Sequence, residues 1–199
     1  MPNKSKSQKS RNTNMKLTDG EKLIILMLTE MYEKLQIEGE TEPDFLRSAI
    51  FNNHLWGIRW KYSGIPFEQA EDPPIVREVV DILDMWSFIE YSYGKLSEQD
   101  RQQLALAAKP FGESLRFNGF DGNNESEHMS VAMFLVNQLD RFQEFKGRSF
   151  NCHRPSLGEY RRMFAVFEPL RPSLADSSLS VGQLARILNE RVHPSRREV

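Results

Sequence analysis

The sequence of 199 residues contains a single cysteine, Cys152. One cysteine cannot form a disulfide within the chain, which excludes a disulfide scaffold and fits a reducing compartment. Long apolar runs are also missing: none exceeds six residues, the length of the run over residues 23–28, whereas a membrane-spanning helix needs about 20. We therefore expect a cytoplasmic protein that has no membrane partner.

The chain has no excess of basic residues, and its charge is unevenly distributed. Five basic and no acidic residues among residues 1–16 carry +5, so the rest must carry −7 to give the net charge of −2. An acidic body binds nucleic-acid phosphates poorly. The polar composition of residues 1–15 predicts a disordered basic tail, and residues 192–199 are expected to form a flexible C-terminal tail.

The usual nucleotide and metal motifs are absent from the sequence. It has no P-loop, no G-x-G-x-x-G and no C-x-x-C. An EF-hand beginning at Asp121 fails as well, because its required glycine would fall on Ser126 and its final glutamate on Ala132. Cys152 adjoins His153 without a catalytic motif around the pair, so we interpret Cys152 as a loop residue. No cofactor is expected.

Apolar residues recur with a helical period and nowhere alternate as in a strand. The pattern predicts an all-α single domain over residues 16–191 with about six to eight helices. The expected helices cover residues 18–37, 43–50, 72–89, 98–109, 124–145, 156–168 and 180–189. Whether the second helix continues to Trp60 is left open. The helix over 72–89 has the widest apolar stripe and is expected to be the most central.

Helix starts are marked by capping residues. Thr18, Ser156 and Ser180 are each followed three residues later by Glu or Gln, which predicts three capping boxes. Residues 121–124 (DGNN) predict a turn, in which Asn123 or Asn124 caps the next helix and the acids at 125 and 127 favour the positive end of its dipole.

Glu125 and His128 are three residues apart on one face of a predicted helix. Di-metal helical bundles present ligands in this way, but they need two further inward-facing carboxylates. Because such short pairs arise easily by chance, we expect no metal and keep Glu125 and His128 as candidate ligands.

Residues 54–62 (HLWGIRWKY) interleave aromatic and basic side chains. Such a segment can stack bases and hold phosphates as a single-strand platform. Alternatively, Trp56 and Trp60, four residues apart, pack inward while Arg59 and Lys61 face solvent. We favour the inward packing.

Several segments resemble the YfbU family. They are residues 17–26 (LTDGEKLIIL), 80–86 (VDILDMW), 117–125 (FNGFDGNNE), 141–142 (RF) and 160–163 (YRRM). The resemblance spans residues 17–189 and excludes both tails. It implies an all-helical, cytoplasmic, bacterial protein, and it brings no assigned activity or catalytic residues.

These observations predict a non-enzymatic helical interaction or regulatory module that forms a homo-oligomer or binds a protein partner. Trp56, Trp60, Phe117, Phe120 and Asp121 are the candidate contact residues. The alternative is a nucleic-acid-binding regulator that uses the basic N-terminal tail and residues 54–62. A metal-dependent hydrolase using the Glu125 and His128 face is a third, weaker hypothesis.

Overall fold

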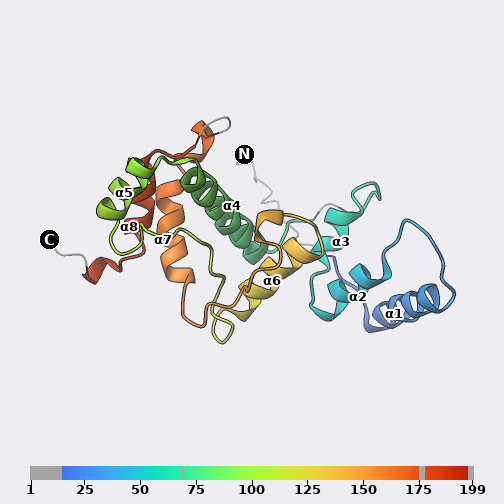
Figure 1. Cartoon of the computed structure of the whole chain (residues 1–199). Coiled ribbons are helices and arrows are strands. Elements are labelled where there is room, and N and C mark those ends of the chain that lie inside the picture. The colour runs from blue at the N-terminus through green and yellow to red at the C-terminus, as the bar shows by residue number, and fades with distance from the viewer. Residues whose placement is uncertain (1–14, 69, 175–177, 197–199) are drawn as a thin grey trace, which may run out of the picture. The chain divides into compact units, whose positions relative to one another are not determined.

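The computed structural model describes residues 15–68, 70–174 and 178–196. Within these ranges it contains eight α-helices, three 3-10 helices and no β-strand, which confirms the all-α class and the expected number of helices (Figure 1). None of these helices is long and apolar enough to cross a membrane. The predicted disordered tail lies outside the described residues except for Met15. The predicted C-terminal tail includes the 3-10 helix η3 (Pro194–Arg196), and residues 197–199 are likewise outside.

The chain divides into two compact units, residues 1–73 and 74–199, and each is described by itself. Unit 1 contains α1 (Asp19–Lys34), α2 (Pro43–Phe51) and α3 (Trp56–Lys61). Thr18 begins α1 with the predicted capping box, in which Thr18 and Glu21 each accept a hydrogen bond from the other's main-chain N–H. After Phe51 the chain leaves the helix, and Asn53 takes a φ of 57°. The pattern over residues 43–60 therefore forms two helices.

Aromatic residues form much of the buried part of unit 1. Phe45 and Trp56 are 1% and 5% exposed. The ring of Trp56 lies edge-on to Trp60 at 5.2 Å between centroids, and Phe45 lies edge-on to Tyr62 at 5.9 Å. Edge-to-face pairs of this kind add to the free energy gained by burying the rings.

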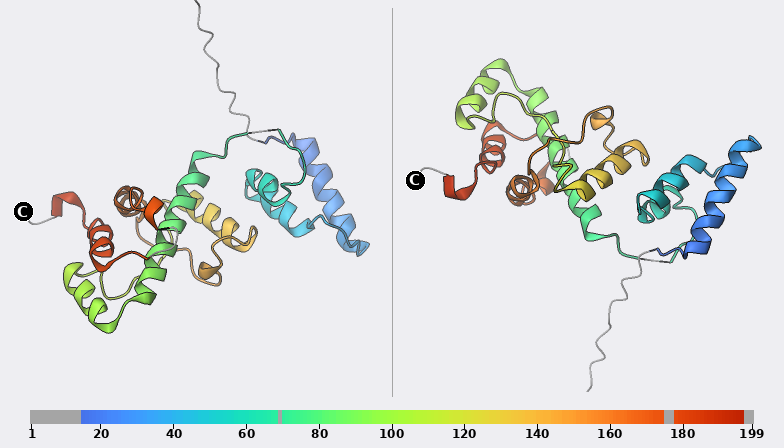
Figure 2. Two further views of the ribbon diagram at one scale, coloured as in Figure 1. Left: turned by 90° about the horizontal axis from the view of Figure 1, so that it is seen from above. Right: turned by 90° about the horizontal axis from the view of Figure 1, so that it is seen from below.

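Unit 2 is built around its longest helix. It contains α4 (Pro74–Lys95), α5 (Glu98–Ala107), α6 (Ser126–Asn137), α7 (Leu157–Phe167) and α8 (Val181–Asn189), with the 3-10 helices η1 (Gln143–Phe145) and η2 (Arg171–Ser173). α6 and α7 pack on either side of α4, and α8 packs on α5 and α7 (Figures 1 and 2). Eight residues of α4 are buried, in agreement with the central position expected from its wide apolar stripe.

An aromatic cluster connects α4 and α7 to the loops between helices. Phe117, which is 2% exposed, is at its centre. Its ring lies 5.3–6.1 Å from five other rings, those of Trp86, Phe120, Phe145, Phe150 and Tyr160. The rings come from residues as far apart in sequence as Trp86 and Tyr160. The cluster is therefore a tertiary feature that a local sequence pattern cannot specify.

The helix predicted over residues 124–145 is wrong beyond Asn137, where α6 ends. Asp140 and Phe142 take φ values of 51° and 49°, which interrupt an α-helix. Phe145, in η1, is fully buried against Phe117. The apolar residues after Asn137 keep a helical spacing in sequence, but Phe145 enters the aromatic cluster from outside an α-helix.

Phe117→Ala is expected to lower the free energy of unfolding by about 3–5 kcal/mol, because truncating a buried aromatic side chain leaves a cavity. Leu106→Ala, at a side chain on α5 that is 69% exposed, is the control and is expected to change it by less than about 0.5 kcal/mol. Urea denaturation followed by circular dichroism measures both. A small effect at both positions would contradict the cluster's role in the core.

Candidate functional site

The loop that precedes α6 is held against the segment that precedes α7. The N–H of Phe120 donates to the carbonyl of Phe150, and the N–H of Cys152 donates to the carbonyl of Phe120, both at 2.9 Å. Gly119 has a φ of 90°, and a Cβ at this position would overlap the main chain of Phe150. Glycine is therefore required for the two segments to approach this closely.

Asp121 organises the turn that leads into α6. Its side chain is 2% exposed, with Oδ1 accepting from the N–H of Asn123 at 3.0 Å and Oδ2 from the amide of Asn124 at 2.6 Å. Hydrogen bonds from Asn124 and then Asn123 lower the pKa of Asp121. The predicted turn is present, but the predicted cap is wrong, because the N-cap position of α6 is held by Glu125.

The carboxylate of Glu125 joins two segments, the turn before α6 and the start of α7. Its Oε2 accepts from the N–H of Asp121 at 2.9 Å and from the hydroxyl of Ser156 at 2.8 Å. Its Oε1 accepts from the N–H groups of Ser156 and Leu157 at 2.9 and 2.8 Å. Ser156 and Leu157 begin α7, and the first N–H groups of a helix have no partner within it. Glu125 therefore caps the N-terminus of α7, although Ser156 is 31 residues away in sequence.

Glu125 is 9% exposed, yet it stays charged at neutral pH. Burial by itself raises its pKa, but the hydrogen bonds from Asp121, Leu157 and Ser156 outweigh that effect and lower the pKa below its ordinary value of 4.5. The negative charge also lies at the positive end of the α7 dipole. The sequence predicted such a role for Glu125 only on its own helix, and it held no signal for the contact with α7.

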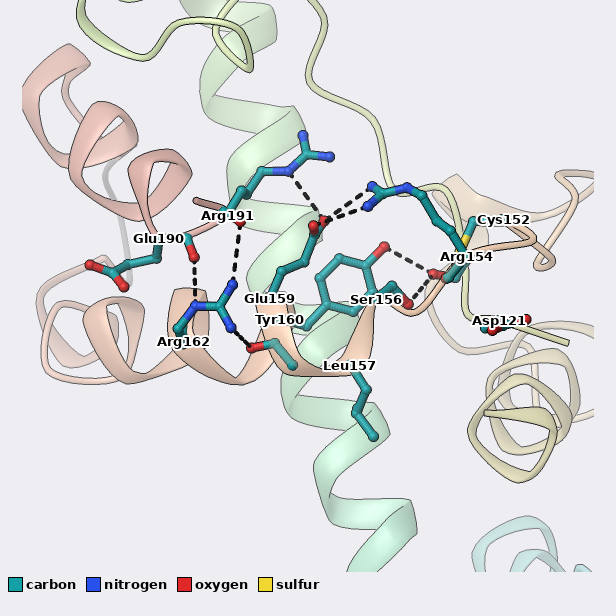
Figure 3. A network of polar contacts seen from close by, with 12 residues as sticks. Asp121, Cys152, Arg154, Ser156, Leu157, Glu159, Tyr160, Arg162, Glu190 and Arg191 are labelled. Atoms are coloured by element: carbon teal, nitrogen blue, oxygen red, sulfur yellow. Dashed lines mark hydrogen bonds and ion pairs between the residues drawn. The ribbon is translucent and has the colours of Figure 1, made fainter. Parts of the chain in front are cut away.

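Ser156 begins α7, but its predicted capping box is wrong. Its hydroxyl is directed to Glu125 and to the carbonyl of Gly119, at 2.8 and 3.2 Å. The hydroxyl of Tyr160 donates to the same carbonyl at 2.9 Å (Figure 3). Burial raises the pKa of Tyr160, which keeps it protonated as a donor. The Gly119 carbonyl therefore accepts hydrogen bonds from the hydroxyls of both Ser156 and Tyr160.

The two candidate metal ligands point to different partners. Glu125 uses its carboxylate for the four hydrogen bonds above, and Nε2 of His128 lies 2.9 Å from Oε2 of Glu78 on α4. Glu78 also accepts from Arg161, and this bond is the largest cause of its lowered pKa. In the ranges that the structure covers, no three His, Cys, Asp or Glu side chains gather as a metal site would need.

The candidate contact residues are mostly core residues. Trp56, Phe117, Phe120 and Asp121 are between 0% and 5% exposed, and Trp60 is partly exposed. Their role in binding a partner stays a prediction. A partner could reach the buried ones only if the surrounding unit opened.

The basic residues of segment 54–62 are paired within unit 1. Arg59 donates to the carbonyl of Ala70 at 2.5 Å and to Asp72 at 2.7 Å. Lys61 pairs with Glu42 at 2.7 Å and lies over the ring of Phe45. Cations that are neutralised in this way are less available to hold phosphate.

Comparison with known proteins establishes the family. The sequence model of the YfbU domain matches residues 15–190, which include all eight α-helices and the loop over 117–125. The chain belongs to the YfbU family. This confirms the resemblance seen in the sequence, and it assigns no activity to any residue of this YfbU protein.

A UPF0304 protein of the archaeon Methanocaldococcus jannaschii is 30% identical over 95 residues, which are 45% of this chain and 53% of that protein. The chain spans about half the length of this curated relative. Because the relative is archaeal, the bacterial origin implied by the resemblance stays a prediction.

Gly119→Ala is expected to lower the free energy of unfolding by more than about 3 kcal/mol, since left-handed strain and overlap with Phe150 add together. Gly147→Ala is a matched control: its φ is 77°, but among the described atoms none lies within 4 Å of the added Cβ. We expect it to cost about 1 kcal/mol. Thermal denaturation compares the two, and similar losses would show that close approach is not what requires glycine at 119.

Glu125→Gln is expected to lower the free energy of unfolding at pH 7 by about 2–3 kcal/mol, because the amide NH2 would face N–H donors that a carboxylate accepts. Glu127→Gln, on an exposed side chain of the same helix, is the control.

The loss at Glu125 is also expected to depend on pH. Its folded-state pKa lies below the ordinary 4.5, so its contribution is complete above that value and disappears as the pH falls through the folded-state pKa. Urea denaturation between pH 7 and pH 3 measures the difference between wild type and variant. A difference that stays constant over this range would rule out the charged carboxylate as its source.

Proposed function

We propose that this YfbU-family protein is a non-enzymatic helical interaction module that self-associates, or binds a protein partner, through α1. The observation that carries the proposal is a set of six large apolar side chains on one side of this helix, here called the outer face of α1. They are Leu23, Ile24, Met27, Leu28, Met31 and Leu35, each between 49% and 64% exposed.

The outer face of α1 is contiguous and opposite to the face that packs on α2. With about 100° per residue, its six side chains fall within an arc of about 140° and extend over about 18 Å. The inner face holds Thr29, which is 3% exposed, and Glu33, which pairs with Arg47 of α2. α2 therefore covers the inner face of α1 and leaves the outer face exposed.

Single exposed apolar residues are normal on protein surfaces, but a contiguous stripe indicates an interaction site. Covering the exposed half of each side chain contributes about 1 kcal/mol. The estimated cost of association is about 4–15 kcal/mol. Two such faces together offset the lower part of this range but not its upper end. This supports an association that depends on protein concentration.

Self-association is favoured because one face is enough for it. In a two-fold dimer the same patch of both copies meets itself, so an apolar stripe of this kind is complementary to its own copy. The two methionines at its centre add side chains that adapt to irregular surfaces. A cytoplasmic location of the dimer remains part of the proposal.

The alternative of a nucleic-acid-binding regulator gains no specific support. Arg59 and Lys61 are engaged by Asp72 and Glu42, and Trp56 is buried. The basic tail on which the alternative also depends lies outside the described residues.

The double substitution of Met27→Lys and Met31→Lys is expected to abolish self-association, because it places four charges in a two-fold contact. Leu106→Lys, at an equally exposed apolar residue on α5, is the control and is expected to change nothing. Light scattering over a range of protein concentrations measures the mass. A wild-type chain that stays monomeric argues against self-association, and an oligomer that survives the double substitution argues against α1.

A further inference from the structure

Unit 2 contains a polar pocket of about 320 Å3 beside the paired segments that precede α6 and α7. Its lining includes the side chains of Arg116, Asn118, Ser149, Asn151, Cys152 and Arg154. We propose that this pocket binds a small phosphorylated molecule. The proposal is independent of the α1 interface, because it depends on other residues in the other unit.

Arg116 supplies a positive charge that the protein does not neutralise. Its side chain is exposed, and within the part of the chain that the structure describes it has neither a hydrogen-bond nor an ion-pair partner. A guanidinium is positively charged in proteins, and it offers five N–H donors. The pocket therefore holds a fixed cation with free donors.

Arg154 supplies a second charge that is only partly compensated. Its guanidinium lies 3.2–3.3 Å from the carboxylate of Glu159, which also accepts from Arg191 at 3.2 Å (Figure 3). One carboxylate thus faces two guanidiniums, which leaves a net positive charge.

Glu90, a carboxylate bonded to the main chain of Phe117, already has its own arginine partner. The two oxygens of Glu90 accept from the guanidinium of Arg148 at 2.7 and 2.8 Å, and one of them also accepts from the N–H of Phe117. Asp121 and Glu125 accept from amide, hydroxyl and main-chain donors and from no arginine, and among the described contacts Arg116 pairs with none of these carboxylates.

Amide groups complete the set of donors. Oδ1 of Asn151 accepts from the N–H groups of Gly122 and His153, both at 3.0 Å. These two bonds determine the orientation of the amide, so its NH2 group remains a donor. The amide of Asn118 is exposed at the same pocket. Phosphate oxygens accept hydrogen bonds from guanidinium and amide N–H groups.

The size and lining of the pocket favour a small polar phosphate ester. Its volume is at the lower end of the roughly 300–1,000 Å3 typical of small-molecule sites. Phe117, its aromatic neighbour, is 2% exposed and offers no ring face on which a base could stack. A long polyanion is disfavoured because residues 17–199 carry a net charge of −7.

The test is calorimetric titration of the full chain at low ionic strength with glucose 6-phosphate, inorganic phosphate, glucose, succinate and a short oligonucleotide. We expect saturable one-to-one binding of the phosphates and none of glucose. Arg116→Gln and Arg154→Gln are each expected to weaken that binding at least about tenfold, since hydrogen bonds to charged groups are worth about 1.5–3 kcal/mol. Arg141→Gln removes an exposed arginine outside the pocket and is expected to change binding less than about twofold.

Arg116→Gln keeps the test independent of folding, because no contact of Arg116 within the described residues is lost. Wild type is expected to gain thermal stability from phosphate, and this variant is expected to gain less at the same phosphate concentration. Three results would overturn the proposal: no saturable phosphate binding, an equal loss in Arg141→Gln, or tighter binding of succinate or the oligonucleotide than of glucose 6-phosphate.

Discussion

The buried carboxylate of Glu125 is the interaction on which the arrangement of unit 2 depends. It accepts hydrogen bonds from the turn at Asp121 and from Ser156 and Leu157 at the start of α7. The donors of Asp121 and Ser156 are buried and would be costly to leave without an acceptor. A single carboxylate therefore joins the turn before α6 to the start of α7.

The hydrogen bonds of Glu125 also affect the arrangement of the core and of the surface. The same two segments are joined by the main-chain bonds of Phe120 and by the close approach at Gly119, and they direct Phe117 and Phe150 into the aromatic cluster. On their outer side they present the cations of the polar pocket. Buried hydrogen bonds hold the backbone on both sides of the pocket, so the positions from which its donors extend are fixed before any ligand arrives.

α1 and α4 show how similar sequence patterns lead to different surfaces. Both helices carry broad apolar stripes, and α4 has its stripe buried by its neighbours in unit 2. In α1 the buried residue is Thr29, while Met27 and Leu35 are each 64% exposed. The two units therefore present different surfaces: an exposed apolar helix face in unit 1 and a polar pocket lined by two arginines in unit 2.

The sequence by itself determined the all-α class, the family and most helix starts, because periodicity and capping act over three or four residues, as at Thr18 and Ser180. Only the tertiary structure decided where α6 ends, what Glu125 and Ser156 bind, and which apolar stripes are covered. These features depend on partners tens of residues away, as the 31 residues between Glu125 and Ser156 show. A local pattern shows that a side chain needs an apolar or polar partner, and the fold selects which one it meets.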